Sequence, residues 1–469
     1  MSTANTATFD DLMKSAMHHH PPPGDSESKN FDSQVGQAVR WAESNRRDVF
    51  DENLGLVPSL ARAVMCRYRF DKDSGGALYV YAGGVYSRGA EEAVRTELRD
   101  VLQDWGKLKS WRSSTGDEVA RYICDAHTPR LWEVPPLDEI NVLNGIVDVR
   151  TGVLREHTPE FLSSIQLPIQ YDRDAKCPAW FRFLESTLPE DLHRLIWQYI
   201  GLLLVPDMSY QKAALFFGPG GNGKSVLIDA ILALLGRSNV SSKTLHQLEE
   251  NRFAAADLMG KLANVSSDLP AQHLADSSMF KMIVGCDEVD AERKHQPAFK
   301  FRPFARMLFS ANTFPRSGDA TDGFFRKWIV FPFEKSFEGT ERRNKRELDA
   351  ELQSHAELSG ALNMALQGLA SLRRSGFYES ATAKDAARAF RETTDPLSVW
   401  LESRTERDGT ARIPCNELLF TFNEEVSKVN GQSFLTAHTM TKTLRDKGIE
   451  RKRSGDWFYF GLRWKAASE

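Results

Sequence analysis

The sequence predicts an α/β fold, because an apolar strand, a glycine-rich loop and an apolar helix follow one another directly. The strand covers residues 213–217, the loop 218–225 and the helix 226–235. Two further apolar segments, at 261–268 and 304–312, each end in a polar side chain. Strands that alternate with helices form mainly parallel sheets. We therefore expect an α/β P-loop ATPase core over residues 209–380.

The stretch before this core has a different pattern. Residues 1–30 are polar and low in complexity, which predicts a disordered tail. Residues 31–172 combine amphipathic segments at 33–50 and 91–108 with turn signals between β-branched runs, which are typical of hairpins: Gly83-Gly84, Asn144-Gly145 and Thr151-Gly152. We expect an α+β domain here.

Two predominantly helical regions flank the core. An apolar helical pair, interrupted at Pro189, predicts a helical collar over 173–208. After a helical stretch at 350–375, a charged, alanine-rich link leads to Pro396. Two helices, a turn, a third helix and a terminal hairpin then follow, in the order of a winged helix, which we expect over 381–469.

The composition excludes a fibrous repeat and a chain that is disordered throughout. Of the 469 residues, 41% are hydrophobic and 26% charged, as in globular proteins. The formal charge of -4 means that contacts with nucleic acid must come from local basic features. No apolar run of about 18 residues and no secretory signal occurs, so we expect no membrane contact and a cytoplasmic location, in the host cell if a phage encodes the protein. Five single cysteines predict reduced thiols.

The glycine-rich loop, GPGGNGKS, matches the pattern G-x-x-x-x-G-K-S. Its glycines let the backbone wrap around a phosphate at the positive end of the following helix. Lys224 is expected to contact the β- and γ-phosphates of a nucleotide, and Ser225 to ligate Mg²⁺. The expected nucleotide-binding residues are Gly218, Pro219, Gly220, Gly221, Asn222, Gly223, Lys224, Ser225 and Val226.

Two polar residues at strand ends are candidates to complete this site. Asp268 has the position of a carboxylate that holds the metal, and Asn312 that of an amide that holds the attacking water. Each also has a plainer interpretation, in which Asp268 caps a turn and Asn312 belongs to one. Leu269 follows where many ATPases have a second acid, so the water-activating base is not identified.

Cations after the third strand are a further candidate group. Arg326 and Lys327 precede another apolar strand. They are either a solvated pair at a strand edge or include an arginine finger, which reaches from one subunit into the nucleotide site of the next.

A hairpin with a cationic tip is expected between the second and third strands. Extended arms at 288–291 and 298–304 flank Arg293, Lys294 and His295. Such a tip can bind DNA phosphates in a channel without reading the base sequence. Solvated hairpin tips are also commonly charged, so spacing alone leaves both interpretations open.

These motifs together resemble superfamily 3 helicases of the phage and plasmid primase-helicase C-terminal family, whose relatives include poxvirus primase-helicases. The resemblance covers roughly residues 140–465 and is carried by GPGGNGKS, LMGKLANVSSDLP, FKMIVGCDEVDAERKHQPAFKF, LFSANTFP and GFFRKWIVFPF, in this order. It implies an AAA+-like core that hydrolyses ATP with Mg²⁺, in a hexameric ring that translocates 3′ to 5′ along one DNA strand.

The same resemblance implies a role for individual residues. Lys224 and Ser225 match Walker A, Asp268 matches Walker B, and Asn312 matches sensor 1. The remaining matches are Arg326 as the arginine finger, Lys294 with His295 as the DNA-binding tip, and Lys281 with Asp287 in the intervening motif.

The sequence thus favours a replicative helicase of a phage, prophage or plasmid-like element. It would act on single-stranded or forked DNA, with a separate primase or other replication proteins as partners. The predicted winged helix is expected to bind duplex DNA or a partner through its basic end: Lys442, Arg445, Lys447, Arg451, Lys452 and Arg453. Two alternatives stay open, a nucleotide-switched origin-binding initiator and a primase-polymerase that uses its N-terminal region.

Overall fold

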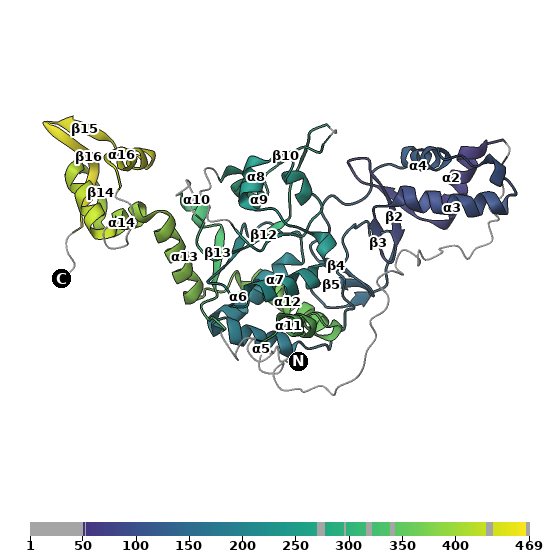
Figure 1. The fold of residues 1–469 in the computed structure, drawn as a ribbon, viewed down its shortest axis with the longest axis horizontal. Helices are drawn as coiled ribbons and strands as arrows, with labels where there is room; N and C mark the ends of the chain where they lie inside the picture. Colours follow the sequence, from purple (N-terminus) through teal and green to yellow (C-terminus); the bar gives the residue numbers. More distant parts are fainter. Residues whose placement is uncertain are drawn as a thin grey trace, which may run out of the picture. The chain divides into compact units, whose positions relative to one another are not determined.

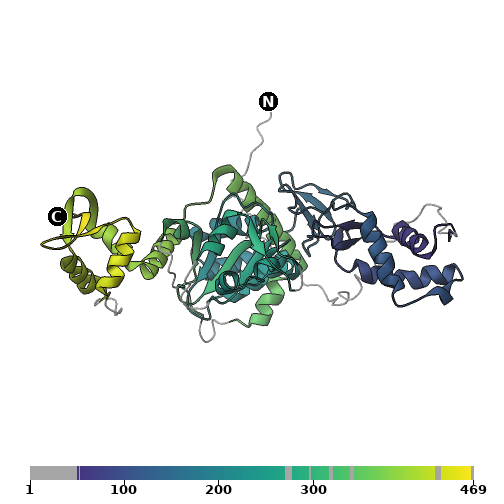
Figure 2. The same cartoon turned by 90° about the horizontal axis from the view of Figure 1, so that it is seen from above.

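The structure, a computed structural model, describes residues 50–51, 53–269, 277–294, 297–315, 321–337, 343–427 and 435–465 (Figures 1 and 2). The tail predicted over 1–30 and nearly all of the helix predicted over 33–50 lie outside these residues. The described chain divides into two compact units. The first contains the residues up to 269 together with 278–313 and 327–383, and the second contains 314–326 and the residues from 384 onward.

The first unit begins with helices and a three-stranded antiparallel sheet of order β1-β2-β3. The β2–β3 turn contains Gly83 and Gly84, and α3 covers most of the segment predicted as a helix at 91–108, so both predictions are confirmed. The elements are α2 (Leu56–Arg67), β1 (Phe70–Lys72), β2 (Leu78–Ala82), β3 (Val85–Ser87), α3 (Ala90–Asp104), the 3₁₀ turn η1 (Leu108–Ser110) and α4 (Thr115–Ala126).

A second small antiparallel sheet follows, with the order β4-β5-β6. Its strands are β4 (Glu139–Val142), β5 (Gly145–Asp148) and β6 (Leu154–Arg155). The turns that join them contain Asn144-Gly145 and Thr151-Gly152, which confirms the predicted hairpins.

The centre of the first unit is a five-stranded parallel sheet of order β13-β7-β12-β9-β8. This sheet confirms the α/β prediction. The elements around it are α5 (Pro178–Thr187), η2 (Glu190–Leu192), α6 (His193–Leu203), β7 (Ala213–Phe217), α7 (Lys224–Leu235), η3 (Arg237–Asn239), β8 (Val240–Ser241), α8 (Leu245–Glu250), η4 (Ala255–Leu258), β9 (Ala263–Ser266), α9 (Ser278–Gly285), β10 (Val289–Ala291), β11 (Phe299–Phe301), β12 (Arg306–Ala311), β13 (Trp328–Pro332), α11 (Lys345–Leu352) and α12 (His355–Ser375).

Both faces of this sheet are covered by helices. Leu308 and Phe331 belong to the hydrophobic core that contains α6, α7 and α12. The neighbouring strand positions, Phe309 and Trp328, face the other way, and Phe280 of α9 stacks on Trp328 with ring centroids 4.6 Å apart. Strands buried on both faces consist of continuous apolar runs, which is why the sequence alone could locate them.

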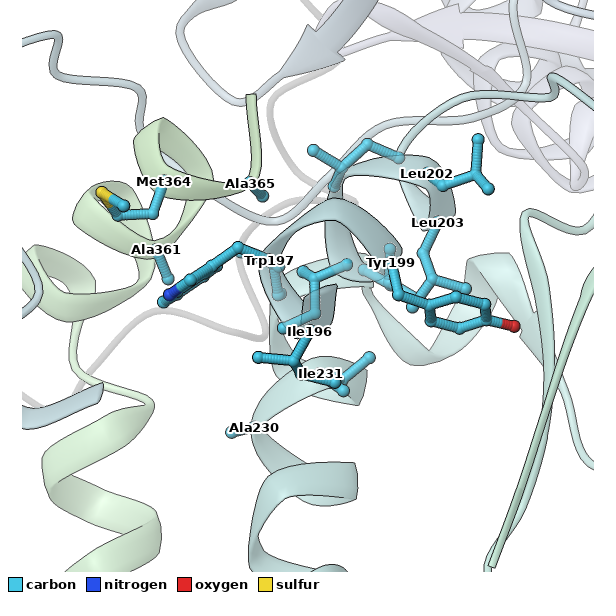
Figure 3. Packing of buried hydrophobic residues seen from close by; sticks show 14 of the residues in the cluster. Ile196, Trp197, Tyr199, Leu202, Leu203, Ala230, Ile231, Ala361, Met364 and Ala365 are labelled. Carbon is cyan, nitrogen blue, oxygen red and sulfur yellow. The ribbon is translucent and has the colours of Figure 1, made fainter. Parts of the chain in front are cut away.

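The helical pair predicted as a collar lies in this same core. Figure 3 shows Trp197 of α6 directed toward Ala361 and Met364 of α12. The helices approach closely at Gly368, where a Cβ atom would lie only 2.3 Å from the carbonyl oxygen of Trp197. Helices α5 and α6, predicted as a collar, are therefore part of the hydrophobic core of the parallel sheet.

The second unit contains a three-stranded antiparallel sheet of order β14-β16-β15. Its elements are α10 (Asp322–Phe325), most of α13 (Ala381–Thr394), α14 (Pro396–Arg404), β14 (Thr405–Pro414), α15 (Cys415–Phe422), the π-helical turn η6 (Asn423–Ser427), α16 (Ala437–Asp446), β15 (Arg451–Ser454) and β16 (Asp456–Trp464). The terminal hairpin of β15 and β16 was predicted.

Two segments of this region differ from the prediction. Residues 381–394, expected as a link, form helix α13, whose Phe390 is buried. Residues 405–414 form strand β14, which pairs with β16. The sequence of β14, TERDGTARIP, lacks an apolar alternation because only Thr405 and Ile413 are buried, so its conformation depends on the partner strand.

The structure also shows the state of the cysteines and the character of the described helices. All five cysteines are free thiols, as predicted. Within the described residues, no helix combines the length and the apolar character that crossing a bilayer requires.

The contact between α6 and α12 can be tested at Gly368. We expect Gly368→Ala to lower the free energy of unfolding by about 1–3 kcal/mol, because the added methyl group overpacks the contact. Helix propensity alone would raise this free energy by about 1 kcal/mol, so the sign separates the two effects. Urea denaturation followed by circular dichroism measures the change. Ala370→Gly, on the exposed side of the same helix, is the control for propensity. A Gly368→Ala protein as stable as the wild type would contradict the close approach.

Candidate nucleotide-binding site

The loop between β7 and α7 has a backbone conformation that glycine residues make possible. Gly218 and Gly223 have φ angles of 150° and 90°. A Cβ atom at Gly218 would lie 2.2 Å from the carbonyl oxygen of Phe333, and one at Gly223 would lie 2.8 Å from Cγ2 of Thr187. The loop therefore packs directly against the end of β13 and against α5.

Lys224, the first residue of α7, is buried inside this loop. Its Nζ donates hydrogen bonds to the carbonyl oxygens of Gly218 and Pro219, at 2.5 and 2.7 Å, and to Oδ1 of Asn222 at 3.0 Å. Asn222 is itself buried and donates from Nδ2 to the Phe333 carbonyl at 2.7 Å. Burial lowers the pKa of the Lys224 ammonium from its ordinary value. The ammonium is thus held within the curve of the loop.

A cavity of about 570 Å³ opens beside the loop. Residues 220–226 line it, together with Ser267, Asp268, Ser310 and Asn312. Asp268 follows β9 by two residues and Asn312 directly follows β12. Because β7, β12 and β9 are neighbouring parallel strands, their carboxyl ends lie at one edge of the sheet. The structure therefore brings the candidates Lys224, Ser225, Asp268 and Asn312 to a single cavity.

The donors in this cavity fit a magnesium ion. Ser225 and Asp268 are both exposed and both line the cavity. Mg²⁺ prefers oxygen ligands and is usually bound by one or two protein groups together with water and substrate phosphates. No cluster of three or more His, Cys, Asp and Glu suited to a metal ion occurs in the part of the chain that the structure describes. A sparse oxygen site is the kind that a P-loop metal uses.

Two walls of the cavity were not predicted. Ala179, Phe183 and Thr187 of α5 form one, and Leu348 and Leu352 of α11 form the other. Apolar side chains of this kind suit the flat faces of a nucleobase. The sequence contains no signal for these walls, since apolar residues at helical spacing are equally typical of a core.

The rim of the cavity is rich in cations. Arg182, Arg343 and Lys345 all line it. Glu351 accepts hydrogen bonds from Arg182 at 2.8 Å and from Arg343 at 2.7 Å. Burial raises the pKa of Glu351, but these two guanidinium groups outweigh it and hold the pKa below its ordinary value. Lys345 pairs with Asp229 at 2.6 Å and with Asp349 at 2.5 Å, so each of these three cations already has a carboxylate partner.

The two cations after α10 have different environments. Arg326 is exposed and belongs to the second unit, whereas Lys327 is buried in the first. The Nζ of Lys327 donates to Oε1 of Gln211 at 3.5 Å. In the intervening motif, Lys281 of α9 is half-buried, and Asp287, just before β10, is exposed.

The predicted hairpin is present, with β10 and β11 paired antiparallel. Lys294 is exposed beyond β10, whereas Arg293 is half-buried. The Arg293 guanidinium lies 5.1 Å from the ring centroid of Phe299 and contacts Sδ of Met259 at 3.6 Å. His295 lies outside the described residues. Of the three predicted tip residues, Arg293 is therefore engaged within the hairpin and Lys294 faces solvent.

A second hollow, of about 320 Å³, lies between α16 and β15 in the second unit. Its lining residues are Ala437, His438, Thr441, Lys442, Arg445 and Arg451. Next to it, the Arg451 guanidinium lies 4.3 Å from the ring centroid of the exposed Trp457. Two other cations of the predicted basic end have carboxylate partners, since Lys447 pairs with Asp395 at 3.4 Å and Lys452 pairs with Glu450. Arg453 is exposed.

Fold and site together define the general class of the protein. A parallel sheet carries a glycine loop between a strand and a helix, with a buried lysine in the loop and polar side chains at the adjacent strand ends. This arrangement is that of a P-loop nucleotide-binding protein.

Comparison with known families narrows this class. Residues 59–189 match the family described as D5 N terminal like, and residues 216–327 match a family of unknown function, DUF5906. Residues 59–189 are therefore similar to a D5-type N-terminal region, which agrees with the resemblance to poxvirus-type primase-helicases seen in the motifs. The DUF5906 match includes the glycine-rich loop and helix α7, as well as Asp268, Asn312 and Arg326.

Solved structures of low sequence identity also resemble this chain. The apo structure of the NrS-1 C terminal region is 13% identical, covers 86% of this chain and 98% of its own, and has a TM-score of 0.49. The A form apo structure of that region is 13% identical, covers 85% and 98%, and also has a TM-score of 0.49.

The unpredicted apolar wall can be tested at Leu348, which is only partly buried. We expect Leu348→Ala to raise the Kd for ATP and ADP about 3–10-fold, since about 1 kcal/mol of apolar contact with the base is lost. Fluorescence titration with a labelled nucleotide measures the change. Inorganic tripolyphosphate has no base, so its competition should be unaffected.

Glu347→Ala, on the exposed side of the same helix, is the matched control. An unchanged nucleotide Kd in Leu348→Ala, or equal weakening of tripolyphosphate, would remove the wall from the nucleotide site.

Proposed function

We propose that this protein is an ATP-dependent DNA helicase. It forms a hexameric ring that moves 3′ to 5′ on single-stranded DNA during replication of a phage, prophage or plasmid-like element. The observation that carries the proposal is the cavity lined by Lys224, Ser225, Asp268 and Asn312. Among P-loop ATPases, the relationship to D5-type proteins supports a helicase.

In the proposed mechanism, the phosphates of ATP lie in the loop. Its backbone N–H groups and the Lys224 ammonium bind the β- and γ-phosphates and stabilise the charge that develops there. Mg²⁺ held by Ser225 and Asp268 would neutralise charge on the phosphate oxygens. Asn312 orients the attacking water toward the γ-phosphate. The wall that contains Leu348 binds the base, so that both ends of ATP are fixed.

The neighbouring subunit supplies Arg326. An exposed guanidinium such as that of Arg326 can extend across a subunit boundary, whereas Lys327 is buried. This difference supports Arg326 as the arginine finger. The strand order β13-β7-β12-β9-β8 supports an AAA+-like core, the type of core that assembles into rings.

DNA contacts the hairpin in the channel of the ring. The exposed Lys294 is the main described contact, with His295 beside it in sequence, because Arg293 packs on Phe299 and Met259. Each lysine that neutralises a phosphate adds affinity that falls with salt concentration.

The second unit acts as a winged helix. Its hollow brings Lys442, Arg445 and Arg451 together beside the exposed ring of Trp457. Helix α16 next to a β-hairpin has the arrangement in which winged helices bind duplex DNA. We infer that this surface binds the duplex ahead of the ring.

The same surface favours a second candidate function. A nucleotide-switched initiator would use α16 and β15 to bind origin duplex, and nucleotide would control assembly rather than processive motion. Unwinding of a forked substrate supports the helicase, whereas a footprint on duplex without unwinding supports the initiator.

The roles of loop and hairpin are tested by two lysine variants. We expect Lys224→Ala to abolish ATP hydrolysis, because the β- and γ-phosphates lose their cation. Lys294→Ala should keep basal hydrolysis but lose its stimulation by single-stranded DNA and the unwinding of forked DNA. Phosphate release and strand-displacement assays measure these activities.

Lys300→Ala is the matched hairpin control, since Lys300 lies within 3.8 Å of two carboxylates, those of Glu288 and Asp290. It should unwind DNA nearly as the wild type does. Normal unwinding by Lys294→Ala would reject the channel role of the tip.

The role of Arg326 in a neighbouring site is tested by mixing subunits. We expect rings of Arg326→Ala alone to hydrolyse ATP about 10³-fold more slowly, the lower end of values for arginine fingers. Rings mixed from Arg326→Ala and Lys224→Ala subunits should regain activity, because the second variant supplies Arg326 to the intact loop of the first.

Subunits that carry both substitutions are the control, since mixing them with Lys224→Ala leaves every loop without Lys224. Mixed rings verified by native mass spectrometry that regain no activity would contradict a finger acting between subunits.

A further inference from the structure

An aromatic cluster in the second unit surrounds the segment that ends in Arg326. Phe314 stacks on Phe390 of α13, with ring centroids 5.1 Å apart and planes at 25°. Phe325 meets the same ring edge-on at 5.6 Å, and Phe324 lies 6.2 Å from it. Phe324 and Phe390 are almost fully buried, with 0% and 1% of their surfaces exposed. The Phe390 ring of α13 thus contacts Phe314, which precedes residues 316–320, and Phe324 and Phe325, which follow them.

The next residue of α13 adds polar contacts to the same segment. Arg391 pairs with Asp322, the first residue of α10, at 2.9 Å. Its guanidinium also lies 5.8 Å from the ring centroid of Phe325. A second ion pair, to Glu402 of α14 at 2.8 Å, connects the same side chain to the following helix. Arg391 therefore joins α10 to α14.

Helix α10 cannot hold its own orientation. It contains only four residues, Asp322–Phe325, and a helix of one turn is unstable without tertiary contacts. Arg326 is the next residue and its backbone N–H donates to the carbonyl of Asp322 at 3.0 Å, so α10 fixes the backbone before Arg326, while the buried Lys327, whose carbonyl accepts from Ala213 at 2.7 Å, fixes it on the other side. Phe390 and Arg391, two neighbouring residues of α13, both contact α10.

We propose that Phe390 and Arg391 are positioning residues for Arg326. They fix α10 so that the guanidinium points toward the γ-phosphate bound by the adjacent subunit. This inference rests on the proposed function and adds that helix α13 of the C-terminal region, outside the P-loop motifs, controls the rate of hydrolysis. Arg391 also contacts Glu402 of α14, the helix that leads into the β14-β16-β15 sheet.

The two residues contribute unequally. Asp322 is 82% exposed at its side chain, and ion pairs at such sites contribute little. The buried rings dominate, because aromatic pairing and apolar burial stabilise a contact more than an exposed ion pair does. Misplacement of a catalytic group by about 1 Å costs about 10²-fold in rate. Phe390 should therefore matter more than Arg391.

The test compares Phe390→Ala with Arg326→Ala, singly and together. We expect Phe390→Ala to lower kcat for ATP about 10–100-fold, with the nucleotide Kd and hexamer formation within twofold of the wild type. Added to Arg326→Ala, it should cause no further loss, because a missing finger cannot be misplaced. A merely structural role would lower nucleotide affinity or assembly, and its effect would multiply with that of Arg326→Ala.

Two further variants complete the design. Phe390→Leu keeps an apolar side chain and should recover most of kcat, and it replaces Phe390→Ala in the cycle if the latter fails to fold by circular dichroism. Arg388→Ala removes an exposed cation of the same helix that pairs with Asp385 at 3.2 Å, and it should leave kcat unchanged.

The outcomes separate this inference from the proposed function. A wild-type protein without ATP hydrolysis, or Arg326→Ala with normal kcat, would overturn the finger itself. Normal finger behaviour with a Phe390 variant that keeps full kcat, or that multiplies with Arg326→Ala, would overturn the positioning role alone.

Discussion

The parallel pairing of β7 with β12 and β13 is the constraint on which the candidate site depends. Phe217 at the end of β7 is in register with Ala311 and Pro332. Backbone bonds from Gly218 to the Ala311 carbonyl, at 3.2 Å, and from Phe333 to the Phe217 carbonyl, at 2.7 Å, extend both pairings into the loop. The start of the loop is therefore fixed beside Asn312. A slip of the register would separate the loop from the polar residues that share its cavity.

The same loop allows Lys224 to be buried. A lysine ammonium removed from water needs several acceptors, and the loop supplies three oxygens around Nζ. Asn222 links that network to the Phe333 carbonyl beyond β13. The fold thus holds the cation inside the loop with all three of its N–H donors in use, so a phosphate that binds Lys224 has to displace at least one of these oxygens.

Much of the parallel sheet and of the candidate site could be predicted from the sequence. The residues that carry the local pattern there are also the ones that form the sheet and the loop in the folded protein. The strands β7 and β13 are apolar throughout, and the pattern of the glycine-rich loop identifies its own residues. The prediction failed where side chains depend on a distant partner. Strand β14 exists through pairing with β16, whereas the alanine-rich sequence of α13 favours a helix by itself and only the packing of its Phe390 depends on the fold. Likewise, Arg293 is as charged as Lys294, but only the fold shows that Arg293 lies against Phe299 and Met259.

The sequence by itself determined the phosphate loop, the strands that carry Asp268 and Asn312, and the hairpin between them, because glycine content, apolar runs and turn residues act over a few neighbours. Only the tertiary structure decided which apolar residues of α5 and α11 line the cavity, that Arg326 is exposed while Lys327 is buried, and that α13 packs on the segment that ends in Arg326. These features join residues far apart in the chain, and hydrophobic burial, which drives such contacts, has no preference for sequence distance.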